Sequence, residues 1–238
     1  MNVEEFIRGI AFNKIQPDTP LSELDKMPVI GEPDLESTEL EIANTILPAR
    51  DAALKEILYE ICLLPKMSTF ALGCIINQAV YLMPAGQSYV NAGVWHGFSF
   101  LAGMVNNTHK KCIGIDNFSE FYGPREEFLT RFLQYRSGRH FFFEMDYEKY
   151  FIKFHRGLIG VYMYDGAHNY DSQLKGLRMA EPYFSRGCII IVDDTNWDEP
   201  RTATLDFIDT SPHEYKIILD KRTSGNGNPT FLEDCRLM

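Results

Sequence analysis

The chain has 238 residues, of which 45% are hydrophobic and 24% are charged, the composition of an ordinary globular protein with a sizeable core. Its formal net charge of −10 argues against a nucleic-acid backbone as the main partner, because phosphate binding needs clustered Lys and Arg. The first twenty residues carry acids and lack the apolar core of a signal peptide, and no apolar run is long enough to cross a membrane. We therefore expect a cytoplasmic protein without membrane contact.

The five cysteines are odd in number, widely spaced and without a CxxC pair or any other metal-binding framework. This usage is typical of reduced thiols, mostly buried, in a cytosolic protein. They are Cys62, Cys74, Cys112, Cys188 and Cys235.

Residues 1–85 are predicted to form a helical N-terminal extension or lid without strands. Prolines among acids make residues 1 to about 35 an irregular arm after a short first helix. Thr38 and Glu41 then fit a capping box at the start of a helix. Ser68 can cap a later helix that runs to Met83. Because that last helix is apolar, we consider it a surface for a second subunit and the protein a homo-oligomer.

Residues 86–238 alternate between strand and helix patterns, which predicts a second, Rossmann-like domain. Such alternation implies a mostly parallel sheet with helices on both faces. With an antiparallel last strand over 230–238, the fold class is α/β, a doubly wound, seven-stranded sheet. The other expected strands are Tyr89–Ala92, Lys111–Asp116, His140–Met145, Leu158–Tyr164, Gly187–Asp193 and Tyr215–Leu219.

One predicted helix has a clear start and a clear inward face. Pro124 suits a first helical position, and acids follow it near the positive end of the helix. Its inward face is predicted to consist of Phe128, Leu129, Phe132 and Leu133.

A glycine-bearing turn between two predicted strands, Asn91-Ala-Gly93-Val-Trp-His-Gly97, indicates a ligand site. Gly93 allows the backbone to turn and to approach a ligand closely. Asp116, which ends the next strand, can accept hydrogen bonds from ribose hydroxyls. The spacing is GxxxG rather than the GxGxxG of dinucleotide sites, so a nicotinamide oxidoreductase is disfavoured. A tight turn without a ligand is the competing interpretation.

Three carboxylates follow two other strands: Asp165 after one, and Asp193 and Asp194 after the next. Because parallel strands end at one edge of the sheet, these acids converge and repel one another unless a cation bridges them. Oxygen ligands suit Mg²⁺ or Ca²⁺. The alternative is that the acids cap the helices that follow.

His168 lies three residues after Asp165 and is a candidate general base near neutral pH. The alternative is a surface histidine at a helix start. Tyr122, Tyr170 and Trp197 lie in loops on the same edge, where they could line a substrate pocket or simply pack.

The order of strands, the NAGVWHG turn, Asp116 and the YDGAH and VDDT segments resemble a class I S-adenosylmethionine-dependent methyltransferase. Within that group the chain resembles the metal-dependent macrocin-type O-methyltransferases of sugars and natural products. The resemblance covers roughly residues 88–238. It implies S-adenosylmethionine and Mg²⁺ as cofactors, and methyl transfer to a hydroxyl of a small molecule such as a sugar, a natural product or a catechol-like diol.

The resemblance also assigns roles residue by residue. It implies that the glycine turn holds the methionine part of the cofactor, that Asp116 holds the ribose and that Asp146 lies near the adenine. His168 falls where related catechol-type enzymes place a lysine base. The implied cofactor-binding residues are Asn91, Ala92, Gly93, Trp95, Gly97, Asp116, Asn117, Asp146 and Asp165. The implied metal ligands are Asp165, Asp193 and Asp194, and the implied catalytic residues are His168 and Asp165.

Two positions depart from the family pattern. Asn91 stands where the first motif usually opens with an acid, and it offers the cofactor an amide oxygen without a charge. Ala167 replaces an acid often found two residues after the first metal ligand. These departures keep open a degenerate methyltransferase fold that binds a ligand without turnover, and a metal-independent methyltransferase is the other alternative.

Overall fold

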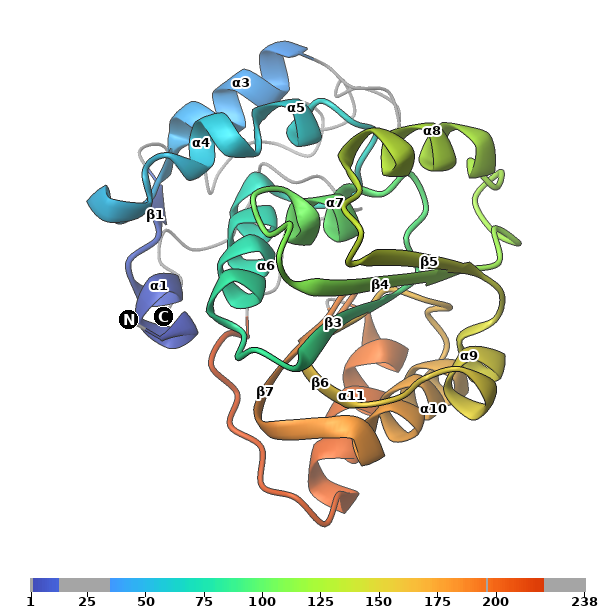
Figure 1. Cartoon of the computed structure of the whole chain (residues 1–238). Helices are drawn as coiled ribbons and strands as arrows, with labels where there is room; N and C mark the ends of the chain where they lie inside the picture. The colour runs from blue at the N-terminus through green and yellow to red at the C-terminus, as the bar shows by residue number, and fades with distance from the viewer. Residues whose placement is uncertain (1, 13–34, 196, 221–238) are drawn as a thin grey trace.

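The computed structural model describes residues 2–12, 35–195 and 197–220. Within these residues, five parallel strands form the central sheet in the order β5-β4-β3-β6-β7 (Figure 1). The chain therefore builds outward from β3 in one direction and then returns to β3 to build in the other. The strands are β3 (Gln87–Ala92), β4 (Lys111–Asp116), β5 (His140–Glu144), β6 (Leu158–Tyr164) and β7 (Phe184–Val192).

Helices cover both faces of this sheet, which confirms the doubly wound α/β class (Figure 1). Each face has its own hydrophobic cluster, one around Phe100 and the other around Tyr162. On the first face lie α6 (Phe70–Leu82), α7 (Phe98–Met104) and α8 (Arg125–Tyr135), and on the second α9 (Tyr147–Lys153), α10 (Tyr170–Ala180) and α11 (Asp198–Thr210). Such double coverage explains why the strand sequences are apolar runs rather than alternating patterns.

The chain before β3 is mainly helical and packs into the first cluster together with the sheet. Its helices are α1 (Val3–Arg8), α3 (Leu35–Asn44), α4 (Leu54–Ile57) and α5 (Tyr59–Cys62), with a short 3₁₀ turn at Ala49–Asp51. The prediction that it holds no strand was wrong, because β1 (Ala11–Phe12) pairs antiparallel with β2 (Thr45–Ile46). Two-residue strands are too short to show any periodicity in a sequence.

The predicted capping box at Thr38 was also wrong. Thr38 lies inside α3, and its hydroxyl points to the carbonyl of Cys62. Glu41 instead reaches the start of α6, where its Oε1 accepts the Phe70 N–H at 2.5 Å and its Oε2 lies 2.7 Å from Lys66 Nζ. Burial raises the pKa of Glu41, although Lys66 opposes the shift. The glutamate therefore ties two distant segments together.

Helix α6 is capped by Thr69 rather than by Ser68, since the Thr69 side chain accepts the Leu72 N–H at 3.0 Å. Most of this helix is buried within its own chain, against α7 and α1. The apolar run that suggested a second subunit is thus used for the core of this chain, and it gives no support to the expected homo-oligomer.

Helix α8 begins one residue later than predicted, because Pro124 is its N-cap and Arg125 its first residue. Phe128 and Phe132 face the core and stack on one another with ring centroids 5.9 Å apart. Leu133, expected on the same face, is 63% exposed. Leu129 is partly buried against the same hydrophobic cluster, so three of the four expected positions face the core.

The expected strand at Tyr215–Leu219 is extended chain without strand pairing. This segment runs back toward α1, where Lys216 Nζ lies 2.8 Å from Glu4 Oε1 (Figure 1). The expected antiparallel strand over 230–238 lies outside the described residues, so the described sheet has five strands rather than seven. In the described ranges, no helix combines the length and apolar character needed to span a membrane.

The buried side chain of His155 makes the stability of the core depend on pH. Its Nε2 lies 3.1 Å from the Gly157 carbonyl, which can only accept, so Nδ1 accepts from the Tyr150 hydroxyl at 3.0 Å. Burial lowers the pKa of His155 to about 4. An unfolded histidine titrates near ~6.5, so the folded state binds fewer protons between these two values.

We therefore expect full stability from this group above pH ~6.5 and a progressive loss as the pH falls toward 4. Thermal unfolding across this range measures the loss as a falling Tm. His155→Gln should show a shallower dependence on pH than the native chain, while the exposed His213→Gln serves as the control. Parallel pH curves for the native chain and His155→Gln would contradict the assignment.

Candidate active site

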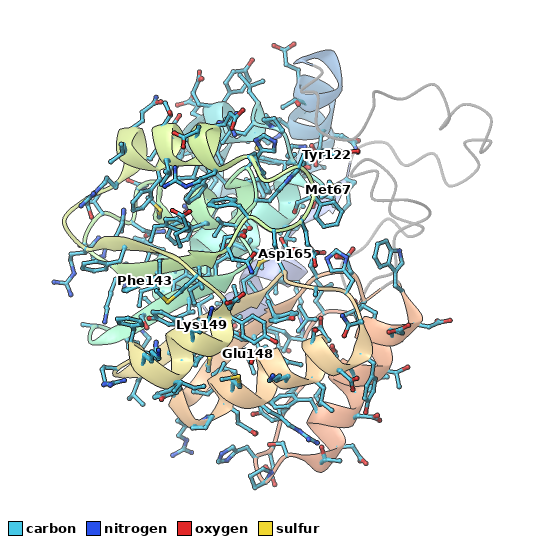
Figure 2. The ribbon with its side chains drawn as sticks, turned by 90° about the vertical axis from the view of Figure 1, so that its right-hand side faces the viewer. Met67, Tyr122, Phe143, Glu148, Lys149 and Asp165 are labelled. Atoms are coloured by element: carbon cyan, nitrogen blue, oxygen red, sulfur yellow. The ribbon has the colours of Figure 1, made fainter. Side chains whose placement is uncertain are left out.

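A cavity of about 580 Å³ opens at the carboxyl ends of the parallel strands, beside the point where the strand order reverses between β3 and β6. Open α/β sheets bind ligands at such switch points. Figure 2 shows Asp165 near the middle of this face, with Met67 from the early helical part on one side and Glu148 of α9 on the other. The cavity is therefore built from segments far apart in the sequence.

Most of the residues singled out from the sequence line this cavity. They are Gly93, Trp95, Asp116, Asn117, Asp146, Asp165, His168, Asp193 and Asp194. Asn91, Ala92 and Gly97 do not line the cavity. Asn91 and Ala92 end β3, and Gly97 is the N-cap of α7. Of the three loop aromatics, Trp197 lines the cavity, whereas Tyr122 is fully exposed and the Tyr170 hydroxyl bonds Asp206 at 2.7 Å.

Gly93 occupies the closest approach between two strands. Its φ of 88° lies in the left-handed region, and an added Cβ would stand 1.7 Å from the Asp165 carbonyl oxygen. Only glycine fits here, because the backbone at the end of β6 leaves no space for a side chain. The Gly93 turn and Asp165 are consequently brought to the same wall of the cavity.

Asn91 is completely buried beneath this turn. Its amide Nδ2 donates to the Gly93 carbonyl at 2.7 Å, and its Oδ1 lies 3.0 Å from Ser99 Oγ and 3.1 Å from the Tyr89 hydroxyl. Both ends of the amide thus have protein partners. An aspartate at this position would lose the donor that holds Gly93, so Asn91 serves as a support of the turn.

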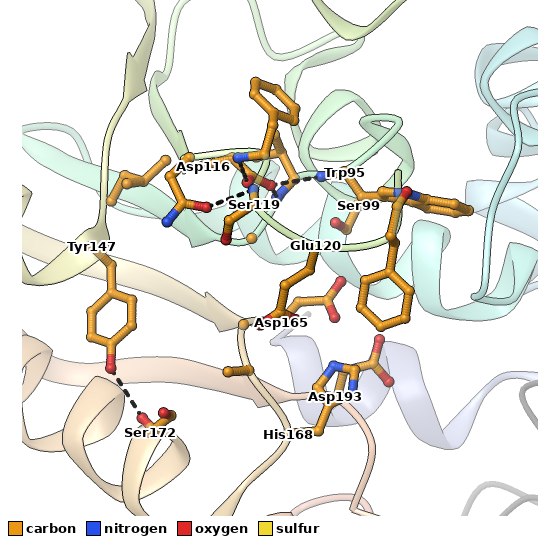
Figure 3. A pocket seen from close by; sticks show the side chains of 18 of the residues that line it. Trp95, Ser99, Asp116, Ser119, Glu120, Tyr147, Asp165, His168, Ser172 and Asp193 are labelled. Carbon is orange, nitrogen blue, oxygen red and sulfur yellow. Dashed lines mark hydrogen bonds between the residues drawn. The ribbon is translucent and has the colours of Figure 1, made fainter. Parts of the chain in front are cut away.

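Asp116 clamps the same turn from the neighbouring strand. Its Oδ2 accepts the N–H groups of Val94 at 2.7 Å and Trp95 at 2.9 Å, and its Oδ1 accepts the Phe118 N–H at 2.7 Å (Figure 3). The clamp holds Trp95 at a φ of 44°, which a non-glycine residue seldom adopts. The carboxylate that the resemblance assigns to the ribose therefore already organises both adjoining loops.

Asn117 and Asp146 meet at the far end of the cavity. Asn117 Nδ2 donates to Asp146 Oδ1 at 2.6 Å, and Lys149 Nζ lies 2.8 Å from Asp146 Oδ2. Beside them the Tyr147 hydroxyl donates to the Ser172 carbonyl at 3.2 Å (Figure 3). This end joins a planar aromatic ring to fixed polar groups, as a nucleobase site requires.

The acidic end of the cavity brings Asp165, His168 and Asp194 together, with one ligand atom of each within 4.8 Å of the others. His168 Nε2 lies 2.9 Å from Asp194 Oδ2. Asp193 faces the same space (Figure 3), but its Oδ1 accepts the Asp194 N–H at 2.9 Å. The converging set thus holds two of the three acids expected from the sequence, Asp165 and Asp194, together with His168 in place of Asp193.

Burial and neighbouring charges shift the pKa values of the groups in this cluster. Burial, together with the charges of Asp193, Asp194 and Asp116, raises the pKa of Asp165. Burial, reinforced by Asp194, raises the pKa of Asp193 to about 6. Burial opposes a charged His168, yet its hydrogen bond to Asp194 and the surrounding acids raise the pKa of the imidazole.

These residues fit a divalent cation. Carboxylates that are buried together and repel one another gain from a positive charge between them. Oxygen donors suit Mg²⁺, and an imidazole nitrogen suits ions such as Zn²⁺ or Fe²⁺. The helix-capping alternative is not supported for Asp193, whose carboxylate bonds the next residue in a turn rather than a helix end.

Sequence reasoning missed several lining residues. Lys66, Met67 and Ser68 come from the chain before β3; the first two carried no motif, and Ser68 was expected only as a helix cap. Glu120 and Phe121 belong to the loop after β4 and point toward the acidic end, where the Phe121 ring lies 6.0 Å from His168. The sequence singled out Tyr122, but its neighbour Phe121 is the aromatic that lines the cavity. In a chain with many aromatic residues, only the fold shows which of the two reaches the site.

Asn91→Asp is expected to destabilise the protein. The buried carboxylate faces the Gly93 carbonyl without a donor, at a cost of about 1–3 kcal/mol. Thermal unfolding should show a Tm lower by roughly 2–10 °C. Asn169→Asp is the control, because this exposed asparagine caps α10 and aspartate caps equally well. An unchanged Tm together with tighter cofactor binding would show that Asn91 faces the ligand instead.

Asp165→Asn is expected to stabilise the protein when no metal is added, because it removes a charge from a repelling cluster. Each kcal/mol regained corresponds to roughly 2–4 °C in Tm for a chain of this size. Since the folded pKa of Asp165 is raised, the native chain loses stability as the pH rises through that pKa, so the gain should be largest at neutral pH and vanish in acid.

Asp146→Asn is the matched control for this experiment. Asp146 is ion-paired with Lys149, which lowers its pKa, so its removal should give no gain in Tm. Equal shifts for the two variants, measured in chelator, would refute the repulsion described for Asp165.

Comparisons with known proteins show what this chain is similar to. Residues 90–195 match the model of a methyltransferase domain family, and no curated protein matches the chain in sequence. The TDP-rhamnose 3′-O-methyltransferase CalS11 of calicheamicin biosynthesis is 15% identical over 84% of this chain and 91% of its own, with a TM-score of 0.51.

Two further solved structures share the fold. A precorrin 8w decarboxylase from Methanobacterium thermoautotrophicum is 13% identical over 71% of this chain and 85% of its own, with a TM-score of 0.51. A Corynebacterium glutamicum protein is 15% identical over 74% of this chain and 87% of its own, with a TM-score of 0.50. These structures establish the fold, which hosts more than one chemistry. The stretch that builds most of the cavity is therefore similar in sequence to a methyltransferase domain, and the chain shares its fold with these solved structures.

Proposed function

We propose that the protein transfers a methyl group from S-adenosylmethionine to a hydroxyl of a small molecule, assisted by a divalent cation. The observation that carries the proposal is the convergence of Asp165, His168 and Asp194 beside the Gly93 turn, in one cavity. The similarity to CalS11, a TDP-rhamnose 3′-O-methyltransferase, supports transfer to oxygen.

The cofactor would lie along the cavity from the Gly93 turn to Asp146. All the residues invoked line the cavity: the Gly93 turn would supply a close backbone approach, Asp116 would lie beside the ribose, and Asn117 and Tyr147 would border the base. S-adenosylmethionine supplies a methyl group on a sulfonium, so the reaction needs little covalent help from the protein. Catalysis by these residues consists of holding two reactants in line and excluding water.

The acceptor hydroxyl would lie at the acidic end. When bound there by Asp165, Asp193 and Asp194, a divalent cation lowers the pKa of that hydroxyl. With its Nε2–H directed to Asp194, a neutral His168 keeps Nδ1 available to take the hydroxyl proton. Asp194 fixes the ring orientation and stabilises the imidazolium that forms.

Thermal-shift measurements test the cofactor. A ligand that binds only the folded state at a hundred times its Kd stabilises by about 2.7 kcal/mol, or roughly 5–10 °C here. We expect such shifts with S-adenosylmethionine and S-adenosylhomocysteine and none with NAD. A flat response to both sulfur compounds would refute the proposal.

Metal removal tests the cation. We expect a chelator, or Asp193→Asn, to lower the methylation rate at least about tenfold while the Tm without metal stays equal or rises. Undiminished methylation in chelator would favour a metal-independent enzyme, and parallel loss of activity and stability would favour a structural role for the acids.

His168→Gln separates a base from a ligand. If His168 is the base, this variant keeps the Tm increase caused by Mg²⁺ and loses activity. Loss of the Mg²⁺-dependent Tm increase would show that the imidazole binds the cation directly, as its place in the converging set permits.

A further inference from the structure

Positive charge gathers at the amino ends of the central strands, on the edge of the sheet opposite the cavity. The segments 105–111, 136–141 and 152–158 lead into β4, β5 and β6, and they hold six Lys or Arg and no Asp or Glu. Among the described residues, none of these six side chains forms an ion pair with a carboxylate. The six are Lys110, Lys111, Arg136, Arg139, Lys153 and Arg156.

Contacts between these segments bring the cations onto one surface. Ser137 Oγ donates to the Thr108 carbonyl at 2.8 Å, which joins the segments before β5 and β4. Ser88 Oγ of β3 donates to the Leu158 carbonyl at 3.2 Å, and Ser88 is also the register partner of Lys111. The starts of β4 and β6 therefore flank the same residue of β3. We call the surface formed by the six cations the basic edge.

The two buried histidines beneath the basic edge do not neutralise it. Burial lowers the pKa of His155, and the charges of Lys111 and Arg156 lower it further. Burial also lowers the pKa of His140, and the charge of Arg136 acts in the same direction. Both imidazoles thus respond to the positive charge around them, and a negative partner has to come from outside these segments.

Exposed apolar side chains lie among the cations. Ile152, Phe154 and Leu158 are 69%, 49% and 51% exposed, in the segment that leads into β6. The Phe154 ring lies 5.8 Å from that of Phe143, and Phe141, on the same face of β5, is 42% exposed. An exposed apolar group of this kind marks a surface that contacts a protein, a nucleic acid or a membrane.

The kind of apolar side chain favours a membrane surface over a nucleic acid. Nucleic-acid bases stack on aromatic rings, but Ile152 and Leu158 are aliphatic and offer no such face. Aliphatic side chains gain free energy when they enter the boundary between headgroups and acyl chains. The long stems of Lys and Arg lie along that boundary while their charges stay at the headgroups. Each Lys or Arg near an anionic leaflet adds attraction.

The charge of the opposite edge of the sheet orients such a contact. The stretches 116–120, 144–148, 165–168 and 193–199, at the carboxyl ends of the strands, hold ten Asp or Glu and no Lys or Arg. The net charge of −10 therefore averages an acidic edge and a basic one. An anionic surface attracts the basic edge and repels the edge that carries the cavity, so the cavity faces the aqueous phase.

We propose that the basic edge docks on the surface of a membrane that contains anionic lipids, with Ile152, Phe154 and Leu158 entering the headgroup boundary. Docking leaves the cavity open at the other edge. It needs no spanning helix, and the described ranges hold none. The inference does not depend on the proposed methyl transfer.

The experiment is sedimentation of the full chain with vesicles of phosphatidylcholine alone and of phosphatidylcholine with roughly one-third phosphatidylserine. We expect the anionic vesicles to bind at least about tenfold more tightly than the neutral ones. Raising the salt concentration from about 0.1 M to about 0.5 M should weaken this binding, because the ions screen the attraction. These measurements use the native chain and need no variant.

Variants then assign the contact. Arg139→Gln/Lys153→Gln removes two exposed cations of the basic edge and is expected to weaken binding to anionic vesicles at least about tenfold. Arg50→Gln/Lys175→Gln is the matched control, because it removes the same charge from side chains that are 58% and 52% exposed and lie outside the basic edge. The control should keep its affinity within about twofold.

Ile152→Gln tests the apolar part of the contact. It removes an aliphatic side chain without changing the charge, so we expect binding about fivefold weaker with an unchanged dependence on salt. Tm values equal to that of the native chain verify the folding of all variants.

Three results would overturn the inference. The first is no binding of the native chain to anionic vesicles, or equal binding to neutral ones. The second is an equal loss of affinity in the two double variants. The third is tighter binding to polyuridylate than to the vesicles with no effect of Ile152→Gln, which would assign the basic edge to a nucleic acid.

Discussion

The contact on which the rest of the site depends is the close approach of the β3 turn to the end of β6. Gly93 leaves no room for a Cβ, because the Asp165 carbonyl would stand 1.7 Å away. This approach occurs where the strand order reverses, so it joins the half of the sheet that holds the Gly93 turn to the half that holds Asp165, Asp193 and Asp194. Asn91 from beneath and Asp116 from beside keep the turn in place, and both do so through backbone groups.

A second constraint is electrostatic. Parallel strands deliver the carboxylates after β6 and β7 to one edge, where burial and mutual repulsion raise the pKa values of Asp165 and Asp193. An arrangement of this kind costs stability and is retained where a bound charge relieves it. This distribution of charge is the physical basis of the proposed cation site.

The chain before β3 contributes both to the hydrophobic core and to the lining of the cavity. Its helices share a hydrophobic cluster with the sheet, and the buried Glu41–Lys66 pair ties α3 to the segment that lines the cavity at Met67 and Ser68. The wall of the cavity thereby includes residues that no site motif in the sequence pointed to. A precorrin decarboxylase has a similar fold, so the fold alone does not determine the chemistry. The scaffold decides where a ligand lies, and the side chains decide what happens to it.

The sequence by itself determined the fold class, all five central strands to within a few residues, and the lining of the cavity by Gly93, Asp116, Asp165, His168, Asp193 and Asp194. These follow from local patterns, since apolar runs, glycine turns and acids at strand ends are written in neighbouring residues. The tertiary structure alone decided that Asn91 supports the turn, that Glu41 reaches α6, that Leu133 faces outward and that Phe121 and Lys66 meet the site. Those outcomes depend on which distant segments pack together, and the contacts between distant segments leave no periodicity in the chain that makes them.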